Sequence, residues 1–407
     1  MSPSVLSPDP GVSTPSRAER LGVTVQWDGW RAFGIGVAMA VPTGVAMVVA
    51  VQHYQAGPAA LATLAGAGAC GFLAAPVVLH VVAALALPVA RAYAGLLVVA
   101  ALAWLAAGLW PSLMTLVAGA AVAQAAVSSA VPLATSWWRA NSADRDRGRW
   151  FSRSIRFEAT GGILGTLVVV LVMRNEAANY LLPIFMSALA IGVAALCAWR
   201  IPGGALPVKG GINPLASLAW LWRDRRFGYI SLSWMIMGFA NFAALPLRVS
   251  YLADPAQGLG YGAALVQILV VGIPTAIRLL VLPYWGRWFD RVDIIAMRMV
   301  INVCFAGAIA CTFTSSLSLQ ILGSVLCGLA FGGGDLAWSL WVTRVAPPER
   351  TGAYMAAHTF LTGFRGLVAP FLSFHLAQGW GMVGIAYGAV GMIVLATVML
   401  WPEMERK

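Results

Sequence analysis

The chain has 407 residues, of which 60% are hydrophobic and only 10% are charged, with a formal net charge of +11. Soluble domains contain about 45–50% apolar and about 25% charged residues, so this composition excludes an ordinary soluble protein. A membrane-spanning helix needs about 20 mostly apolar residues, and such stretches recur along the whole sequence. We therefore expect a helical protein that crosses the lipid bilayer many times.

The excess of positive charge does not require a nucleic-acid partner. Lys and Arg are enriched in the cytoplasmic loops of membrane proteins, and this rule accounts for the charge. The five cysteines lie in apolar stretches without a C-x-x-C pair, so we predict neither a disulfide framework nor a metal site. Met and His in "MAAH" (355–358) would suit copper, but ordinary packing is the preferred interpretation. Because no G-x-x-x-x-G-K-S/T loop is present, we expect no nucleotide cofactor.

The first 26 residues are rich in Ser and Pro and lack an apolar core. They are predicted to be a disordered cytoplasmic tail (1–26) and not a signal peptide. The apolar runs that follow give twelve candidate spans, at about 29–51, 58–80, 82–109, 112–136, 154–173, 179–200, 227–251, 260–283, 293–314, 316–343, 352–377 and 381–401. The boundary between the second and third spans is the least distinct, and Pro88 and Arg91 are its only good break.

Basic residues are distributed unevenly among the gaps between these spans. Odd-numbered gaps such as 52–57, 109–112 and 377–381 contain no Lys or Arg, whereas the even-numbered gaps contain many. Positive residues mark the cytoplasmic side, so both termini are predicted to lie inside the cytoplasmic (inner) membrane. An even number of spans follows, and twelve satisfies this condition.

Two segments about half a chain apart are similar in sequence. "DRGRWFSRSIRFEATGGILG" begins at Asp146 and "ERTGAYMAAHTFLTGFRGLV" begins at Glu349, and each follows the fourth span of its half. Duplicated halves that enclose a site at the bilayer midplane are usual in secondary transporters. The pattern predicts a six-helix bundle over 27–200, a cytoplasmic linker over 201–226, a second six-helix bundle over 227–402 and a cytoplasmic tail over 403–407.

The stretch "PYWGRWFDRVDIIAMR" (283–298) concentrates charge after the eighth span. Gly286, Asp290 and Arg291 match a G-x-x-x-D-R motif, and together with the two six-span halves they resemble the major facilitator superfamily across about residues 29–401. The remaining Gly and two basic residues of that motif are not kept, and the equivalent loop of the first half retains only Arg91. The resemblance implies an all-α fold of 12 transmembrane helices in two pseudo-symmetric six-helix bundles.

The charged stretch also has a direct physical interpretation. Gly286 lets the chain turn tightly, Asp290 can accept hydrogen bonds from helix amides or an Arg, and Arg291 can bind helix C-terminal carbonyls. Such contacts would tie the halves together in one state of a cycle, so we predict a cytoplasmic gate here. A positive loop balanced by two acids is the alternative.

Four ionisable residues lie inside predicted spans, where each is costly unless it is paired or hydrated. They are Glu158, Arg278, Asp335 and Arg365. An Asp335–Arg365 pair is geometrically possible, and Glu158 and Arg278 share the inner third of the membrane, where they can pair or snorkel. Each residue is a candidate for substrate or proton binding or, alternatively, a member of a structural ion pair. The three glycines of "FGGGDLAW" favour the functional role for Asp335.

The family resemblance adds candidates, because the first and fourth spans of each half line the cavity in that family. The polar and aromatic residues there include Gln124, Ser128, Trp234, Asn241 and Trp338. Each of them alone is more often a helix–helix contact than a ligand contact. Some members carry R-x-x-Q-G or G-P-x-x-G-G patterns, and the Arg and the Pro of these patterns are missing here. Their loss argues against a drug/proton antiporter.

The predicted function is secondary active transport of a small solute by alternating access, with Asp335 as the leading proton or substrate carboxylate. Arg278 and Arg365 favour a solute with an anionic group, and coupling to protons is left open. The alternative is a sensor or membrane assembly factor with a transporter-like fold and no flux. We do not expect an enzyme, since no nucleophile–base pair or metal-ligand cluster is present. We expect a monomer without cofactors.

Overall fold

The computed structural model describes residues 16–174, 177–206, 214–347 and 350–404, and these residues are almost entirely helical. Within those ranges the strand-like pairing is limited to an isolated bridge between Pro88 and Ala205. The helices are α1 (Arg17–Ala40), η1 (Val41–Val45), α2 (Ala46–Gln52), α3 (Pro58–Ala84), α4 (Val89–Leu109), α5 (Leu113–Asn141), α6 (Asp144–Val172), η2 (Ala177–Tyr180), α7 (Leu181–Trp199), α8 (Pro214–Ser217), α9 (Trp220–Arg223), α10 (Arg225–Ala253), α11 (Ala263–Gln267), η3 (Ile268–Gly272), α12 (Ile273–Arg291), α13 (Ile294–Thr312), α14 (Leu317–Val345) and α15 (Thr351–Met404). The predicted all-α membrane fold is confirmed.

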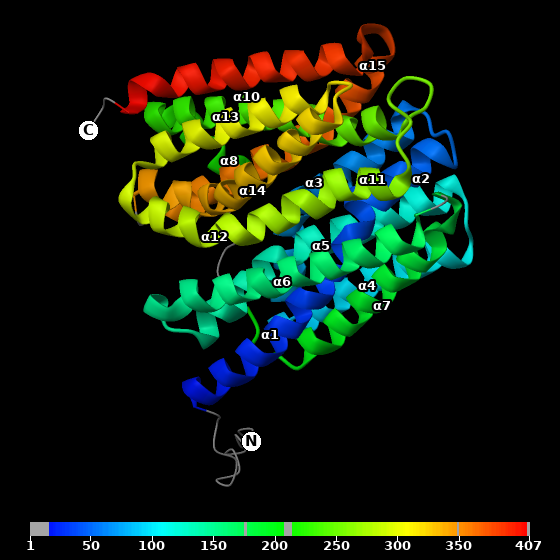
Figure 1. Ribbon diagram of the computed structural model, residues 1–407. Helices are drawn as coiled ribbons and strands as arrows, with labels where there is room; N and C mark the ends of the chain where they lie inside the picture. The colour runs from blue at the N-terminus through cyan, green and yellow to red at the C-terminus, as the bar shows by residue number, and fades with distance from the viewer. Residues whose placement is uncertain (1–15, 175–176, 207–213, 348–349, 405–407) are drawn as a thin grey trace, which may run out of the picture.

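Ten helices in the described part of the chain are long and apolar enough to cross a membrane. One of them, α15, has 54 residues and a positive φ of 71° at Gly381, where Figure 1 shows it turning back. At about 1.5 Å per residue it is far longer than a bilayer is thick, so its two arms can each span. With α1, η1 and α2 counted as one further span, the helices accommodate twelve, and the count beyond ten stays a prediction.

The first helix begins earlier than the sequence suggests. α1 starts at Arg17, where Ser16 and Glu19 form a capping box that satisfies free backbone amides. Arg17 also donates a hydrogen bond to the Ser142 carbonyl at the end of α5. The predicted tail boundary at residue 26 is therefore wrong for residues 17–26, whereas residues 1–15 lie outside the described ranges. Charged helix termini were mistaken for tail because they lack apolar periodicity.

The other boundaries follow local chemistry. The indistinct gap between the second and third spans lies at 85–88, with Pro88 as the N-cap of α4. α8, α9 and the start of α10 occupy most of the described linker, and Asp224 caps α10 by accepting a hydrogen bond from the Phe227 amide. α15 continues to Met404, two residues into the predicted C-terminal tail.

The helices gather in two groups along the chain. In Figure 1 α1, α4, α6 and α7 lie in the lower part of the view, and α10, α13, α14 and α15 lie in the upper part. Two of the helix pairs that join the groups are α3 with α15 and α6 with α12. Glycines permit both contacts, since Gly66 faces the Gly366 carbonyl and Gly162 faces the Thr275 methyl group. The candidate site lies along the second of these seams.

Candidate functional site

Asp335 on α14 pairs with Arg278 on α12, with 2.7 Å between Oδ2 and Nε. The two side chains keep 39% and 27% of their surface exposed although their helices cross the interior, so they face open space. Glycines allow this pair to form. Gly328 and Gly332 let α14 approach α12 closely, and Asp335 lies on the same face of α14. Asp335 thus pairs with Arg278 and not with Arg365, the partner that its depth in the membrane made possible. Residue spacing along a helix gives the depth of a residue but not the direction in which its side chain points.

Glu158 is a residue of the first half that interacts with this ion pair. It lies on α6 and interacts electrostatically with Arg278 and with Arg31. One turn further along α6, Gly162 faces the methyl group of Thr275, which lies one turn before Arg278 on α12. Arg278 therefore interacts with one carboxylate from each half of the chain. The predicted association of Glu158 with Arg278 is an electrostatic one across the seam between the two groups.

A second charged cluster lies in the middle of α1 and was missed in the sequence. Arg31 pairs with Asp28 at 2.8 Å and donates hydrogen bonds to the Tyr93 hydroxyl at 2.7 Å and the Ser154 hydroxyl at 3.4 Å. Asp28 and Arg31 are almost fully buried. The signal was present, since Arg31 falls inside the first predicted span (29–51), whereas Asp28 lies just before it.

Arg365 has a different environment from the one predicted. Its guanidinium donates to the Trp234 carbonyl at 2.5 Å and to the Thr362 hydroxyl at 3.2 Å. Nearby, Arg298 on α13 lies 3.7 Å from the centre of the Trp234 ring. Arg248 on α10 is also buried and donates to the Cys327 sulfur. Arg248 and Arg298 were overlooked, although both are arginines within predicted spans.

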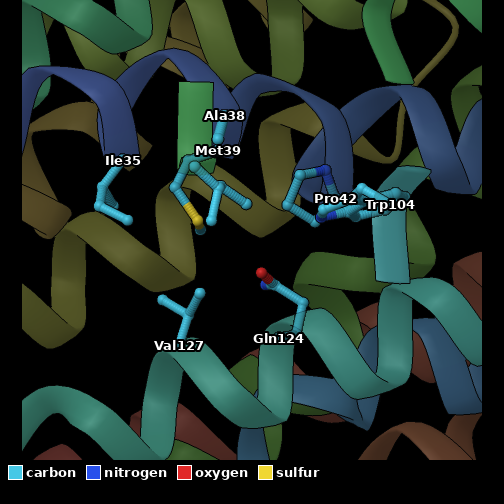
Figure 2. Close-up of a pocket in the computed structure, with 8 residues that line it drawn as sticks. Ile35, Ala38, Met39, Pro42, Trp104, Gln124 and Val127 are labelled. Atoms are coloured by element: carbon cyan, nitrogen blue, oxygen red, sulfur yellow. The ribbon is translucent and has the colours of Figure 1, made fainter. Parts of the chain in front are cut away.

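The remaining candidates lie in two places. Trp338 donates at 3.3 Å to the Thr362 hydroxyl, which also accepts from Arg365. Asn241 donates at 3.0 Å to the Met237 sulfur, which also accepts from Arg298. Gln124 lies apart, in the first half, where it lines a cavity of about 10 Å³ with Pro42 and other residues (Figure 2). That volume holds about one water molecule, so this cavity is too small for a solute.

The predicted turn at Gly286 is wrong. α12 continues through Gly286 to Arg291, and the chain turns only at 292–293, where Asp293 caps α13 by accepting from the Ile295 amide. The side chain of Asp290 lies outside the described residues. Arg291 is exposed and makes no contact with a described side chain, whereas Arg344 donates to the Phe289 carbonyl at 3.4 Å. The gate residues thus make no described contact with the first half in this conformation.

A substitution at Gly286 distinguishes the gate hypothesis from the alternative, a positively charged loop without a role in gating. A Cβ there would meet nothing within 4 Å, so Gly286→Ala is expected to leave stability unchanged or raise it by up to about 1 kcal/mol. If another conformation brings a helix close to Gly286, the same variant lowers the transport rate severalfold. Thermal unfolding and solute counterflow of one preparation measure the two effects. A variant with unchanged counterflow would remove the gate role from Gly286.

The two halves are tied together at the end of the molecule remote from Arg17 and Met404. Gln52, at the end of α2, donates to the carbonyls of Ala253 and Tyr261 at 2.9 and 2.8 Å. Gln267 on α11 donates to the Ala40 carbonyl at 3.0 Å. These bonds close the seam at this end, whereas the charged residues of the α6–α12 contact remain accessible.

A family model described as "Major Facilitator Superfamily" matches residues 32–370, most of the chain. The chain belongs to the major facilitator superfamily. The predicted resemblance is confirmed, and this superfamily fold accounts for the two helix groups. Among curated proteins no sequence match is found.

Solved structures of superfamily transporters resemble this chain over nearly its whole length. The nucleoside transporter NupG matches with a TM-score of 0.72 and 15% identity, covering 95% of this chain and 100% of that chain. A D-xylose–proton symporter matches with 0.68 and 15%, covering 94% and 97%. The human organic anion transporter MFSD10 matches with 0.66 and 15%, covering 95% and 100%. At such identities the likeness shows the fold and does not identify the solute.

Proposed function

We propose that the protein is a secondary active transporter that moves a small solute with an anionic group by alternating access. The observation that carries this proposal is Arg278, which interacts with Asp335 of its own half and Glu158 of the other. A guanidinium with a carboxylate on each side of the seam changes partners when the halves move. Charge inside a membrane protein marks ion or substrate pathways, and all three residues belong to predicted spans.

Competition for Arg278 supplies the coupling. Protonation of Asp335 weakens the Asp335–Arg278 pair, and the freed guanidinium can then interact more strongly with Glu158. Proton coupling through Asp335 is part of this proposal. The partial exposure of the two side chains supports it, because protons can reach a carboxyl group that is 39% exposed.

The membrane orientation is also a proposal. The even-numbered loops are basic, so we place the protein in the inner membrane with both termini in the cytoplasm. In that orientation the bonds from Gln52 and Gln267 close the external end, and the conformation faces inward. We propose a monomer, since one chain contains both halves of the seam.

Reconstitution tests the transport activity directly. Purified protein in proteoliposomes is loaded with a panel of carboxylates, phosphates and neutral analogues, and counterflow is measured with and without a pH gradient. Anionic solutes should exchange, and the gradient should change their rate. Binding without counterflow for every solute would instead support a sensor or assembly factor of the same fold.

Gln267 provides a test of the closed end. Replacing Gln267 by Ala removes its hydrogen bond to Ala40, and we expect the external ends of the halves to separate more often. Distances between labels at positions 55 and 256, measured by pulsed spin resonance, should acquire a longer component. Gln320→Ala is the matched control, because Gln320 is equally buried but donates to the Thr314 carbonyl of its own half. Equal distributions in both variants would contradict the inward-facing assignment.

A further inference from the structure

The second half contains two buried arginines that lack a carboxylate. Arg298 on α13 and Arg365 on α15 are 3% and 4% exposed, and they repel one another electrostatically. No acidic side chain in the described ranges forms an ion pair with either of them. Arg278 and Arg31, by contrast, each have an acidic partner. An unpaired buried charge is strongly unfavourable, so this arrangement is incomplete without an anion.

Aromatic side chains surround the two guanidinium groups. Trp234 lies under Arg298, and its ring stacks on Trp341 with centroids 5.0 Å apart. His358 contacts the rings of Trp234, Trp338 and Trp341 with centroids 5.2–5.5 Å apart. The cation–π contact compensates part of the charge of Arg298, but it leaves the charge of Arg365 without a counterion.

Several buried polar atoms around this pair have no hydrogen-bond partner. They are Arg365 Nε, His358 Nε2, Trp341 Nε1 and Asn241 Oδ1. The first and third are donors, and His358 Nε2 can donate in the tautomer that carries its proton there. Buried polar groups are nearly always satisfied in native proteins, so a cluster of unsatisfied donors next to uncompensated charge indicates a ligand that accepts hydrogen bonds.

Gly238 makes room for the guanidinium of Arg365. A Cβ at Gly238 would overlap the guanidinium of Arg365, so any larger residue on this face of α10 would displace it. The backbone of α10 also supplies the Trp234 carbonyl that orients Arg365. The position of Arg365 is therefore determined by α10, and it does not depend on the Asp335–Arg278 pair.

We propose that Arg298 and Arg365, with His358, bind the oxyanion group of the transported solute, a carboxylate, phosphate or sulfonate. The apolar part of the solute lies against Trp338, which is half-buried and faces Phe72 of the first half with ring centroids 5.9 Å apart. Entry of the solute requires Trp338 to rotate away from Thr362, to which it donates a 3.3 Å hydrogen bond. This inference deepens the proposed transport function and separates an anion-binding centre from the coupling centre at Arg278.

Binding of small aromatic oxyanions to the full-length protein tests the proposal. Benzoate, phenyl phosphate and benzenesulfonate are titrated into purified protein in nanodiscs, and tryptophan fluorescence and calorimetry report binding. Benzamide is the neutral probe, and inorganic phosphate tests the need for the apolar part. We expect the aromatic oxyanions to bind at least about tenfold more tightly than either reference, because the charge-assisted bonds and the aromatic wall act together.

Variants distinguish a ligand site from structural packing. Arg298→Met and Arg365→Met should each weaken oxyanion binding at least about tenfold, which is a change typical of a lost charged hydrogen bond. Each should leave the melting temperature of the free protein unchanged or raised, because an uncompensated charge is removed. Gly238→Ala should weaken binding in the same way with both arginines still present. A melting temperature that falls in all three variants while binding persists would overturn the proposal.

The two proposals fail in different ways. Equal binding of benzoate and benzamide, or no response to any oxyanion, overturns the anion site whatever the transport result. Arginine-dependent binding together with absent counterflow for every solute supports the anion site and overturns the transport function. Asp335→Asn should retain oxyanion binding in either case, since Asp335 belongs to the other centre.

Discussion

Asp335→Asn is expected to lower solute counterflow at least about tenfold, which corresponds to about 1.4 kcal/mol of lost coupling. The variant keeps the shape of the side chain but removes the charge that pairs with Arg278 at 2.7 Å. Arg278 then interacts mainly with Glu158, and the balance between the two halves shifts toward one conformation. Counterflow in proteoliposomes over a range of pH measures both the loss and any change in proton dependence.

Two further variants show that the effect belongs to the ion pair. Exchanging the charges, with Arg278→Asp and Asp335→Arg together, should restore part of the activity that either change removes. Glu19→Gln removes one carboxylate on the exposed first turn of α1 and keeps its capping box, so counterflow should be unchanged. Wild-type counterflow by Asp335→Asn at every pH would contradict a role of Asp335 in transport.

Gly161→Ala is expected to destabilise the protein by about 1–3 kcal/mol, the usual cost of overpacking a tight contact. Gly161 and Gly165 lie one turn apart on α6 and face the backbone of α1. A Cβ at Gly161 would overlap the Phe33 carbonyl oxygen, and one at Gly165 would lie 2.6 Å from the Val37 carbonyl oxygen. Backbone atoms cannot move aside as a flexible side chain can, so α1 and α6 must separate.

The neighbouring Gly162 is the matched control. Its Cβ would lie 3.5 Å from the Thr275 methyl group, which is ordinary contact, and helix propensity favours Ala over Gly by up to about 1 kcal/mol. Gly162→Ala should therefore fold as well as the wild type. Melting curves and yield of monodisperse protein in detergent compare the two variants, and equal curves would contradict the close contact between α1 and α6.

Apolar periodicity and loop charge were sufficient to predict the membrane fold and most span boundaries, whereas the family was predicted from the resemblance of the G-x-x-x-D-R motif and the two halves. They failed where a helix leaves the apolar region, as at Arg17, and where a helix continues through a glycine, as at Gly286. Propensity detects the apolar core of a span, but hydrogen bonds at the ends decide where the helix stops.

The candidate site was predicted only in part, for a geometric reason. Depth along a span can be counted from the sequence, so Asp335, Arg278 and Glu158 were found as a set. Direction around the helix depends on packing, and this is why Asp335 was first matched with Arg365, whose guanidinium points toward Gly238 of α10. A search for every arginine within a predicted span would also have found Arg298 and Arg248.

The contact between Gly162 and Thr275 has a mechanical consequence. When one rigid half rotates against the other about an axis near this seam, the ends of the helices move far. Residues close to the axis hardly move. Arg278 is one turn from Thr275, so small displacements near the axis are expected to be enough to shift its guanidinium between Asp335 and Glu158. Because residues near the axis move little, changes at Arg278 are expected to shift the equilibrium between conformations by small amounts. Substitutions far from the axis, as at Gln267, are expected to act where the two halves separate most, at the closed end.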